Sequence, residues 1–289
     1  MHETARPRRS VLYLPASNLR ALEKARALPC DTVILDLEDA VAPDAKPEAR
    51  AAAVAAVRAG GFGARELVVR VNGLDTPWGA DDVAAVADAR PDAILTPKVS
   101  SAADLAAVRA AAGPELPLWA MIETCAAMFA LPEIAAASLR LKTSVWVMGT
   151  NDLAKEMRCL PGIDRAPLAT ALSLSVMAAR AHGLVILDGV FNDIGDPDGL
   201  ARQCAQGAAW GFDGKTLIHP GQIDTANTAF TPEAAAVAWA RTVVAAFDDP
   251  ATGDKGVLKV EGRMVERLHL EEARRLIAVA EVIAGRVAG

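Results

Sequence analysis

Residues 118–124, with the sequence LWAMIET, decide how this chain is expected to fold. The apolar run from Leu118 to Ile122 ends abruptly at Glu123, which is typical of a buried parallel strand that delivers a carboxylate to the C-terminal edge of a sheet. The next strand candidate, Ser144 to Met148, runs into Gly-Thr-Asn-Asp and brings Asp152 to the same edge. Because α/β proteins keep their chemistry at this edge, Glu123 and Asp152 are the first candidate site residues.

The two acids have two interpretations. Hard divalent cations such as Mg²⁺, or Mn²⁺ in its place, are held by one or two carboxylates, with water and substrate oxygens at the other positions. Glu123 and Asp152 would suit such a metal site. The alternative is that both are helix N-caps, which are common at strand-to-helix junctions. The two residues taken alone leave both interpretations open.

Strand candidates alternate with Ala- and Leu-rich helical stretches along most of the chain, as expected of a parallel sheet covered by helices. Eight such units, and a length of 289 residues, predict an α/β fold of the (β/α)₈ TIM barrel type. No GxGxxG turn follows the first strand, which removes the main support for a dinucleotide-binding sheet. The predicted strands are Ser10 to Leu14, Thr32 to Leu37, Glu66 to Val71, Ala93 to Thr96, Leu118 to Ile122, Ser144 to Met148, Leu184 to Leu187 and Lys215 to Ile218.

Polar residues follow nearly every predicted strand, so we expect them to converge at one end of the barrel. Each alone could be a cap or a solvated loop residue, and only their convergence favours an active site. They are Glu38, Asp39, Arg70, Asn72, Lys98, Glu123, Asp152, Asp188, Asn192 and His219, with Pro15 after the first strand.

The pattern changes after the eighth strand. A helix from Pro232 to Phe247, a loop from Asp248 to Gly256, a short hairpin around Glu261-Gly262 and a final helix from Glu271 to Val287 are predicted. We therefore divide the chain into a catalytic barrel, 1–230, and a C-terminal helix-hairpin-helix extension, 231–289. The extension could cover its own barrel or complete the site of a neighbouring subunit, and the sequence does not decide between these.

Composition excludes several classes of partner. Thirty Lys and Arg against 36 Asp and Glu give a net charge of −6, without a basic run, which argues against nucleic acid and anionic membranes. No apolar run is long enough to span a bilayer, and the N-terminus lacks the apolar core of a signal peptide, so we expect a cytoplasmic protein with a small-molecule substrate. The four cysteines have no CxxC spacing and are expected to be reduced and mostly buried; Cys125, near Glu123, is expected to be structural and not a nucleophile.

The chain resembles the citrate lyase β-subunit-like (HpcH/HpaI aldolase/citrate lyase) family of CoA-ester lyases, which includes malyl-CoA and citramalyl-CoA lyases. Six motifs carry the resemblance in the order of the strands: RSVLYLPASN (9–18), VILDLEDAVAPDAKPEAR (33–50), VVRVNGLDTPW (68–78), MIET (121–124), VMGTNDLA (147–154) and GFDGKTLIHPGQI (211–223). Together they cover nearly the whole chain, whereas any one of them would be weak.

The resemblance implies a role for individual residues. Glu123 and Asp152 would hold Mg²⁺, and Arg70 would contact the carbonyl oxygen of the substrate. Tyr13 and Lys24 fall where the family contacts the CoA ester, and the backbone around Asn151, Ile218 and His219 falls where it lines the pocket. Beside this, the residues themselves indicate a charged shell around the metal, made of Asp36, Glu38, Asp39 and Lys46; for Asp36, a strand residue paired inside the barrel is an equal alternative.

Two positions depart from the family pattern. Asn18 stands where many members carry an arginine for the CoA phosphates, a place that Arg20 could fill. Lyases of the family have an aspartate in the C-terminal hairpin, contributed to a neighbour's site in a homo-oligomer, a trimer or hexamer, and this chain has Glu266 there. Glutamate reaches one methylene further, which could impair protonation of carbon.

The expected function is therefore Mg²⁺-dependent chemistry on a β-hydroxyacyl-CoA thioester such as malyl-CoA. Either retro-Claisen cleavage or hydrolysis to malate and CoA, the reaction of the thioesterase branch of the family, is compatible with these residues. Outside the CoA-ester class, a metal-dependent aldolase on free 2-keto acids and a non-catalytic CoA-binding barrel are the alternatives.

Overall fold

The computed structural model describes residues 6–252 and 255–287. The strands of its first part are β1 (Ser10–Pro15), β2 (Thr32–Asp36), β3 (Glu66–Arg70), β4 (Ala93–Thr96), β5 (Leu118–Ile122), β6 (Thr143–Met148), β7 (Val185–Asp188) and β8 (Gly214–Leu217). Its α-helices are α1 (Leu19–Ala25), α2 (Lys46–Ala59), α3 (Gly79–Ala89), α4 (Ala102–Ala112), α5 (Cys125–Arg140), α6 (Thr150–Met157), α7 (Ala169–Ala181), α8 (Pro197–Ala209) and α9 (Ile223–Ala229), with 3₁₀ turns at Pro43–Ala45, Ala166–Leu168 and Pro220–Gln222.

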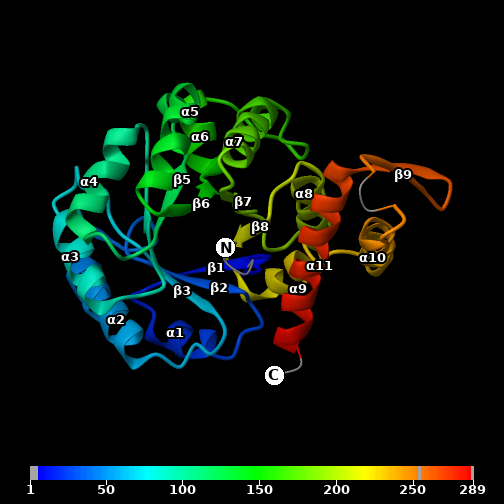
Figure 1. Cartoon of the computed structure of the whole chain (residues 1–289). Coiled ribbons are helices and arrows are strands. Elements are labelled where there is room, and N and C mark those ends of the chain that lie inside the picture. Colours follow the sequence, from blue (N-terminus) through cyan, green and yellow to red (C-terminus); the bar gives the residue numbers. More distant parts are fainter. Residues whose placement is uncertain (1–5, 253–254, 288–289) are drawn as a thin grey trace. The chain divides into compact units, whose positions relative to one another are not determined.

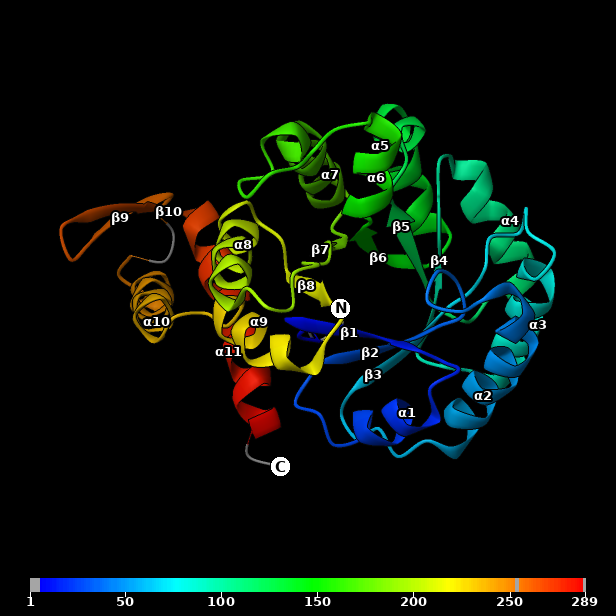
Figure 2. The same cartoon turned by 180° about the vertical axis from the view of Figure 1, so that it is seen from behind.

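The eight strands form a closed parallel barrel in sequence order, inside a ring of helices (Figures 1 and 2). Leu12 of β1 stands opposite Val33 of β2 and Leu217 of β8, which closes the ring without a free edge. This confirms the predicted (β/α)₈ TIM barrel. The barrel occupies the compact unit Arg8–Phe230.

Alternation along the strands divides the buried side chains into two layers. One set packs inside the barrel: Val11, Ile34, Val68, Ala93, Leu95, Trp119, Met121, Val145, Val147 and Leu187. The other set faces the surrounding helices and forms two larger apolar clusters. Trp146 belongs to this outer layer, and its indole N–H donates to the Ser138 hydroxyl at 3.1 Å, so the buried donor is satisfied.

The predicted strands agree with the observed ones to within a residue at either end. Helix boundaries follow local chemistry: Ser101 and Asp104 form a capping box at the start of α4, and Asp196 with Pro197 starts α8. A separate short helix, α6, lies between β6 and α7. Its eight residues, beginning at Thr150, carry Asp152 in their first turn.

The second unit comprises the described residues from Thr231 on, together with Arg6 and Pro7. Its elements are α10 (Ala234–Asp248), β9 (Val257–Val260), β10 (Arg263–Glu266) and α11 (Arg267–Val287), and the two strands pair antiparallel as the predicted hairpin. Glu261 and Gly262 both have positive φ, 46° and 83°, as a tight two-residue hairpin turn requires. The last helix begins at Arg267, four residues before its predicted start at Glu271. Residues 253 and 254 of the predicted loop lie outside the described residues.

This unit has an apolar core of its own, made of Ala240, Val243, Phe247, Leu258, Val260, Val265, Leu270 and Ala273. No helix among the described residues has the length and apolar character needed to cross a membrane. The expectation that this part completes a neighbour's site stays a prediction.

Candidate functional site

Arg70, the last residue of β3, is a firmly anchored side chain at the C-terminal end of the barrel. Its Nε and Nη2 donate to the two oxygens of Asp36, at the end of β2, at 2.7 and 2.6 Å. Its guanidinium lies over the ring of Tyr13, 4.9 Å from the centroid. Burial disfavours its charge, but Asp36 and Glu38 outweigh that effect and hold the pKa of Arg70 well above its ordinary value. Arg70 is therefore a permanent cation with fixed orientation.

The third guanidinium nitrogen, Nη1, contacts both a carboxylate and a thioether. It forms an ion pair with Glu38 at 2.7 Å and lies 3.5 Å from the sulfur of Met121, a residue of β5. Asp39 is further away, at 3.8 Å, and mostly exposed. Nη1 is thus the guanidinium nitrogen that makes no hydrogen bond to Asp36.

Lys46 fixes the loop after β2 through hydrogen bonds to its backbone. The buried ammonium of Lys46 donates to the carbonyl oxygens of Leu37 and Glu38 at 2.9 and 3.0 Å, and to Asn72 at 2.7 Å. Asn72 in turn donates to Asp82 at 2.6 Å. Lys46 therefore orders the backbone that carries Glu38; its place in a charged shell around a metal stays a prediction.

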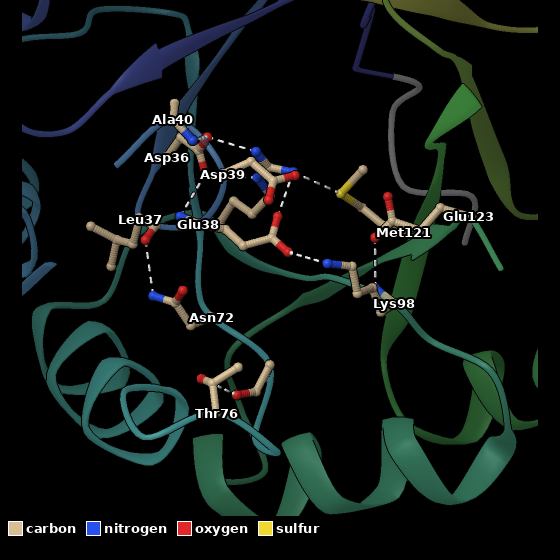
Figure 3. A network of polar contacts seen from close by, with 12 residues as sticks. Asp36, Leu37, Glu38, Asp39, Ala40, Asn72, Thr76, Lys98, Met121 and Glu123 are labelled. Atoms are coloured by element: carbon tan, nitrogen blue, oxygen red, sulfur yellow. Dashed lines mark hydrogen bonds and ion pairs between the residues drawn. The ribbon is translucent and has the colours of Figure 1, made fainter. Parts of the chain in front are cut away.

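Glu123 ends β5 with a carboxyl group that has only one partner. Its Oε1 accepts from the backbone N–H of Lys98 at 2.8 Å, whereas its buried Oε2 has no hydrogen-bond partner. Burial, together with the negative charges of Glu38 and Asp152, raises the pKa of Glu123 to about 8. Figure 3 shows Lys98 between Glu38 and Glu123, with its ammonium 3.4 Å from Glu38 Oε1. Burial opposes the charge of Lys98, but Glu38, Asp39 and Asp152 raise its pKa.

Neither acid of the first pair is a helix cap. Thr124 caps α5 by accepting from Ala127 N–H, and the N-cap position of α6 is Gly149, three residues before Asp152. Asp152 is partly buried, and within the described chain its carboxylate has no hydrogen-bond or ion-pair partner. The structure thus removes the capping alternative and leaves two carboxyl groups available for a ligand.

The donor set fits a hard divalent cation. A buried carboxylate oxygen without a partner is costly, and a cation at Glu123 Oε2 would satisfy it. If ionised, the five carboxylates around the site (Asp36, Glu38, Asp39, Glu123 and Asp152) exceed the three cations (Lys46, Arg70 and Lys98) by two charges. Among the described residues, no group of three or more His, Cys, Asp or Glu side chains could hold a metal by itself. A Mg²⁺ ion on two carboxylates would complete its shell with water and substrate oxygens.

Gly149 closes the other side of Glu123. A Cβ atom added to Gly149 would lie 2.1 Å from Glu123 Oε2 and 2.4 Å from its Cβ. We expect Gly149→Ala to destabilise the fold by about 1–3 kcal/mol, because the β5 and β6 ends must separate to admit the methyl group. Urea denaturation measures this loss. The matched control is Gly285→Ala in α11, where a Cβ meets nothing within 4 Å and stability should hold or rise; equal stability of both variants would contradict the prediction.

The remaining predicted residues lie in several places. Tyr13 sits under Arg70, with its hydroxyl 3.7 Å from the Met121 sulfur, and burial raises its pKa above the ordinary value. Asn151, next to Asp152, exchanges two amide hydrogen bonds with Asn192 at 3.1 and 2.8 Å. Ile218 and His219 follow β8, where the N–H of each donates to Gln222.

The last two predicted residues are both exposed. Lys24 is exposed on α1. Glu266 is exposed on β10 in the other compact unit, where its N–H donates to His269. The roles of both stay predictions.

Asp188 requires a correction. The sequence placed it with the polar residues of the barrel mouth, but it is fully buried and paired with Arg165 at 2.6 Å and Lys215 at 3.1 Å. Its neighbour Leu187 points into the barrel, so alternation turns Asp188 outward toward α8, where Gln203 also accepts from Lys215. It fastens the strand ends to the helix layer.

Sequence reasoning missed Met121 and Asp82, which contact Arg70 and Asn72. Met121 lies two residues before Glu123, so strand alternation alone could have placed it on the same inner face. Among the cysteines, all four have free thiols, but only Cys30 and Cys204 are buried, which corrects the expectation that most are. Desolvation and the nearby Glu156 raise the pKa of Cys125, the opposite of what an activated nucleophile needs.

Comparison with known proteins identifies relatives of this chain. The family described as HpcH/HpaI aldolase/citrate lyase matches residues 9–220. A (3S)-malyl-CoA thioesterase of Cereibacter sphaeroides strain KD131 is 50% identical over 284 residues, 98% of either chain. An L-malyl-CoA/β-methylmalyl-CoA lyase of C. sphaeroides strain ATCC 17029 is 37% identical over 308 aligned residues, covering 96% of each chain.

Among solved structures, CitE from Mycobacterium tuberculosis in complex with magnesium, acetoacetate and coenzyme A is similar to this chain, with a TM-score of 0.78 and 31% identity. The match covers 96% of this chain and all of the other. The family match covers most of the chain, and the fold is the barrel described above, with a pair of acids at the ends of β5 and β6. The chain therefore belongs to the HpcH/HpaI aldolase/citrate lyase family.

Proposed function

We propose that this protein is a Mg²⁺-dependent enzyme that hydrolyses malyl-CoA to malate and CoA. The observation that carries the proposal is the higher identity to (3S)-malyl-CoA thioesterases, 50% against 37% for malyl-CoA lyases, over nearly the full length of all three chains. The coarser statement, an enzyme that acts on a β-hydroxyacyl-CoA, holds for both groups of relatives.

Glu123 and Asp152 are the proposed metal ligands. The free Oε2 of Glu123 and the unpaired carboxylate of Asp152 support this assignment. A bound Mg²⁺ would neutralise the acids and orient the hydroxyl and carboxylate oxygens of the malyl group. Lys98 N–H holds the first oxygen of Glu123 in place, so the second points toward the ligand.

Arg70 is proposed to bind the thioester carbonyl oxygen. When water attacks that carbon, the oxygen gains negative charge, and a guanidinium fixed by Asp36 stabilises the charge without having to reorganise. Nη1 is shared between Glu38 and the substrate. Tyr13, beneath the guanidinium, and Lys24, exposed on α1, are the proposed contacts to the CoA part; the backbone at Asn151, Ile218 and His219 would line the acyl pocket.

Glu266 is proposed as the proton-transfer group, supplied by a neighbouring subunit of a homo-oligomer. In hydrolysis its carboxylate takes a proton from the attacking water, and when the C–S bond breaks it passes that proton to the departing CoA sulfur. In a lyase the acid at this position must instead protonate carbon, and the extra methylene of glutamate displaces it. A displacement of about 1 Å can cost on the order of 100-fold in rate, which favours hydrolysis here.

The alternatives make different demands on the residues. An aldolase on free 2-keto acids would use the same acids but leaves no task for Lys24 or for the C-terminal hairpin. A non-catalytic CoA-binding barrel would not need the anchored Arg70 or the free oxygen of Glu123. Binding of CoA esters without turnover would favour this last alternative.

We expect malyl-CoA with Mg²⁺ to yield free thiol and malate in equal amounts, and little glyoxylate. The measurement follows thiol, malate and glyoxylate separately in one incubation. Glyoxylate and acetyl-CoA as the main products would contradict the thioesterase assignment and make the protein a lyase.

Glu266→Asp should shift the product ratio toward glyoxylate, because the shorter acid restores the geometry of the lyases. Glu261→Asp is a matched control, since Glu261 is an exposed acid of the same hairpin at its turn. An unchanged product ratio in Glu266→Asp would show that this residue does not determine whether malyl-CoA is hydrolysed or cleaved.

A further inference from the structure

Lys98 has a backbone conformation that side chains with a Cβ rarely adopt. Its φ is 52°, in the left-handed region, and it follows β4 at the mouth of the barrel. The conformation turns the N–H of Lys98 away from the strand ladder and toward Glu123 Oε1, at 2.8 Å. Figure 3 shows this N–H and the Glu123 carboxyl group facing each other.

The residues next to Lys98 fix the segment against β5. Val99 N–H donates to the Met121 carbonyl at 3.2 Å, and the Ser100 and Thr124 hydroxyls are 2.8 Å apart. Successive residues of one segment therefore contact Met121, Glu123 and Thr124. Because these contacts surround Lys98, the left-handed turn is a defined part of the site and not a loosely held loop.

We propose that the left-handed backbone at Lys98 is a positioning element of the metal centre: it fixes one oxygen of Glu123 so that the other is presented to the divalent cation. The inference rests on the metal site of the proposed function and deepens it. Gly149 bounds the carboxyl on the opposite side, as the 2.1 Å approach of a hypothetical Cβ demonstrates. The N–H of Lys98 and the backbone of Gly149 together leave Glu123 little freedom to rotate.

Substitutions at Lys98 separate the backbone from the side chain. Glycine adopts positive φ freely and asparagine tolerates it, whereas a β-branched residue is strongly disfavoured there. In metal-free Lys98→Val the backbone should therefore leave the left-handed conformation. Cation binding would have to restore that conformation, which weakens the observed affinity. Lys98→Gly and Lys98→Asn keep the turn.

If only the charge of Lys98 mattered, Lys98→Val should bind the metal more tightly, the opposite of what the backbone predicts. Its ammonium pairs with Glu38 at 3.4 Å and repels a cation at the neighbouring acids, so removing it alone should strengthen metal binding in all three variants. If the backbone of Lys98 positions Glu123, metal binding should instead be weaker in Lys98→Val and in neither of the other two variants. The sign of the change in Lys98→Val therefore distinguishes the two.

The experiment titrates Mn²⁺ alone into the full chain by isothermal calorimetry, without any CoA ester. We expect Lys98→Val to weaken Mn²⁺ binding about tenfold, and Lys98→Gly and Lys98→Asn to bind as tightly as the wild type or more tightly. The matched control is Lys142→Val. Lys142 also has a left-handed φ, 50°, and pairs with a glutamate, Glu115, but it precedes β6 at the other end of the barrel.

Lys142→Val should lose thermal stability much as Lys98→Val does, while keeping the wild-type affinity for Mn²⁺. Equal Mn²⁺ affinity in Lys98→Val and Lys98→Gly would overturn the role of the Lys98 backbone, and the metal site would stand. A wild-type protein that binds no Mn²⁺ would overturn the metal site and this inference together. Product analysis with malyl-CoA tests the reaction independently of both.

Discussion

Glu123→Gln is expected to abolish Mn²⁺ binding and to lower turnover of malyl-CoA by about 1000-fold, because loss of the cation removes several kcal/mol of charge stabilisation. Glutamine keeps an oxygen for the N–H of Lys98 and nearly the same volume. Glu123 is buried with one oxygen unpaired and a pKa raised to about 8, so its charge destabilises the metal-free fold. The variant should therefore unfold at the wild-type temperature or higher in the absence of metal.

Calorimetric titration with Mn²⁺, steady-state kinetics and thermal unfolding together test this expectation. Glu115→Gln serves as the control, since Glu115 is exposed and pairs only with Lys142 in the described chain. Full activity of Glu123→Gln after treatment with EDTA would remove the metal from the reaction. A variant that fails to fold would instead show that Glu123 holds the strand ends together.

Arg70→Lys is expected to lower kcat by about 100- to 1000-fold with little change in KM, roughly the effect of removing one oxyanion donor. The ammonium of lysine keeps the charge but cannot bind both oxygens of Asp36, stack on Tyr13 and reach a substrate oxygen at once. One or more of these contacts must be lost.

The kinetic constants decide which contact matters. A raised KM with unchanged kcat would mean that Arg70 only holds the bound substrate. Arg58→Lys is the matched control: Arg58 pairs with Asp88 at 2.5 Å, but both side chains are mostly exposed, so the variant should behave as the wild type. Thermal unfolding of Arg70→Lys reports separately on the buried pair with Asp36.

Local sequence predicted the barrel because its strands are short apolar runs that end in polar residues. The run from Leu118 to Ile122 is followed by Glu123 in the structure just as in the sequence pattern, and Asp152 arrives one strand later. The family motifs identified Arg70 and the two acids as candidates before any geometry. Strand ends varied by one residue, since pairing with a neighbour, which the sequence does not show, determines where a strand stops.

The contacts between these candidates could not be predicted. Arg70 and Asp36 are 34 positions apart, and only the β2–β3 register brings them together. Asp188 had the same sequence signal as Glu123, a polar residue after an apolar run, but the phase of its strand turns it outward to Arg165 and Lys215. The position of a residue after a strand predicts which end of the barrel it lies at. It does not predict whether its side chain points into the barrel or outward to the helices.

Periodicity and motif order are local properties of the chain, so they were enough to predict the barrel, the family and the two acids as candidate ligands. That Glu123 keeps one oxygen free and caps no helix follows from contacts between distant segments of the chain. That result depends on the N–H of Lys98, 25 positions away, and on the close approach of Gly149. Both come from other strand ends of the closed barrel, and the burial that closure imposes leaves the second oxygen without a protein partner.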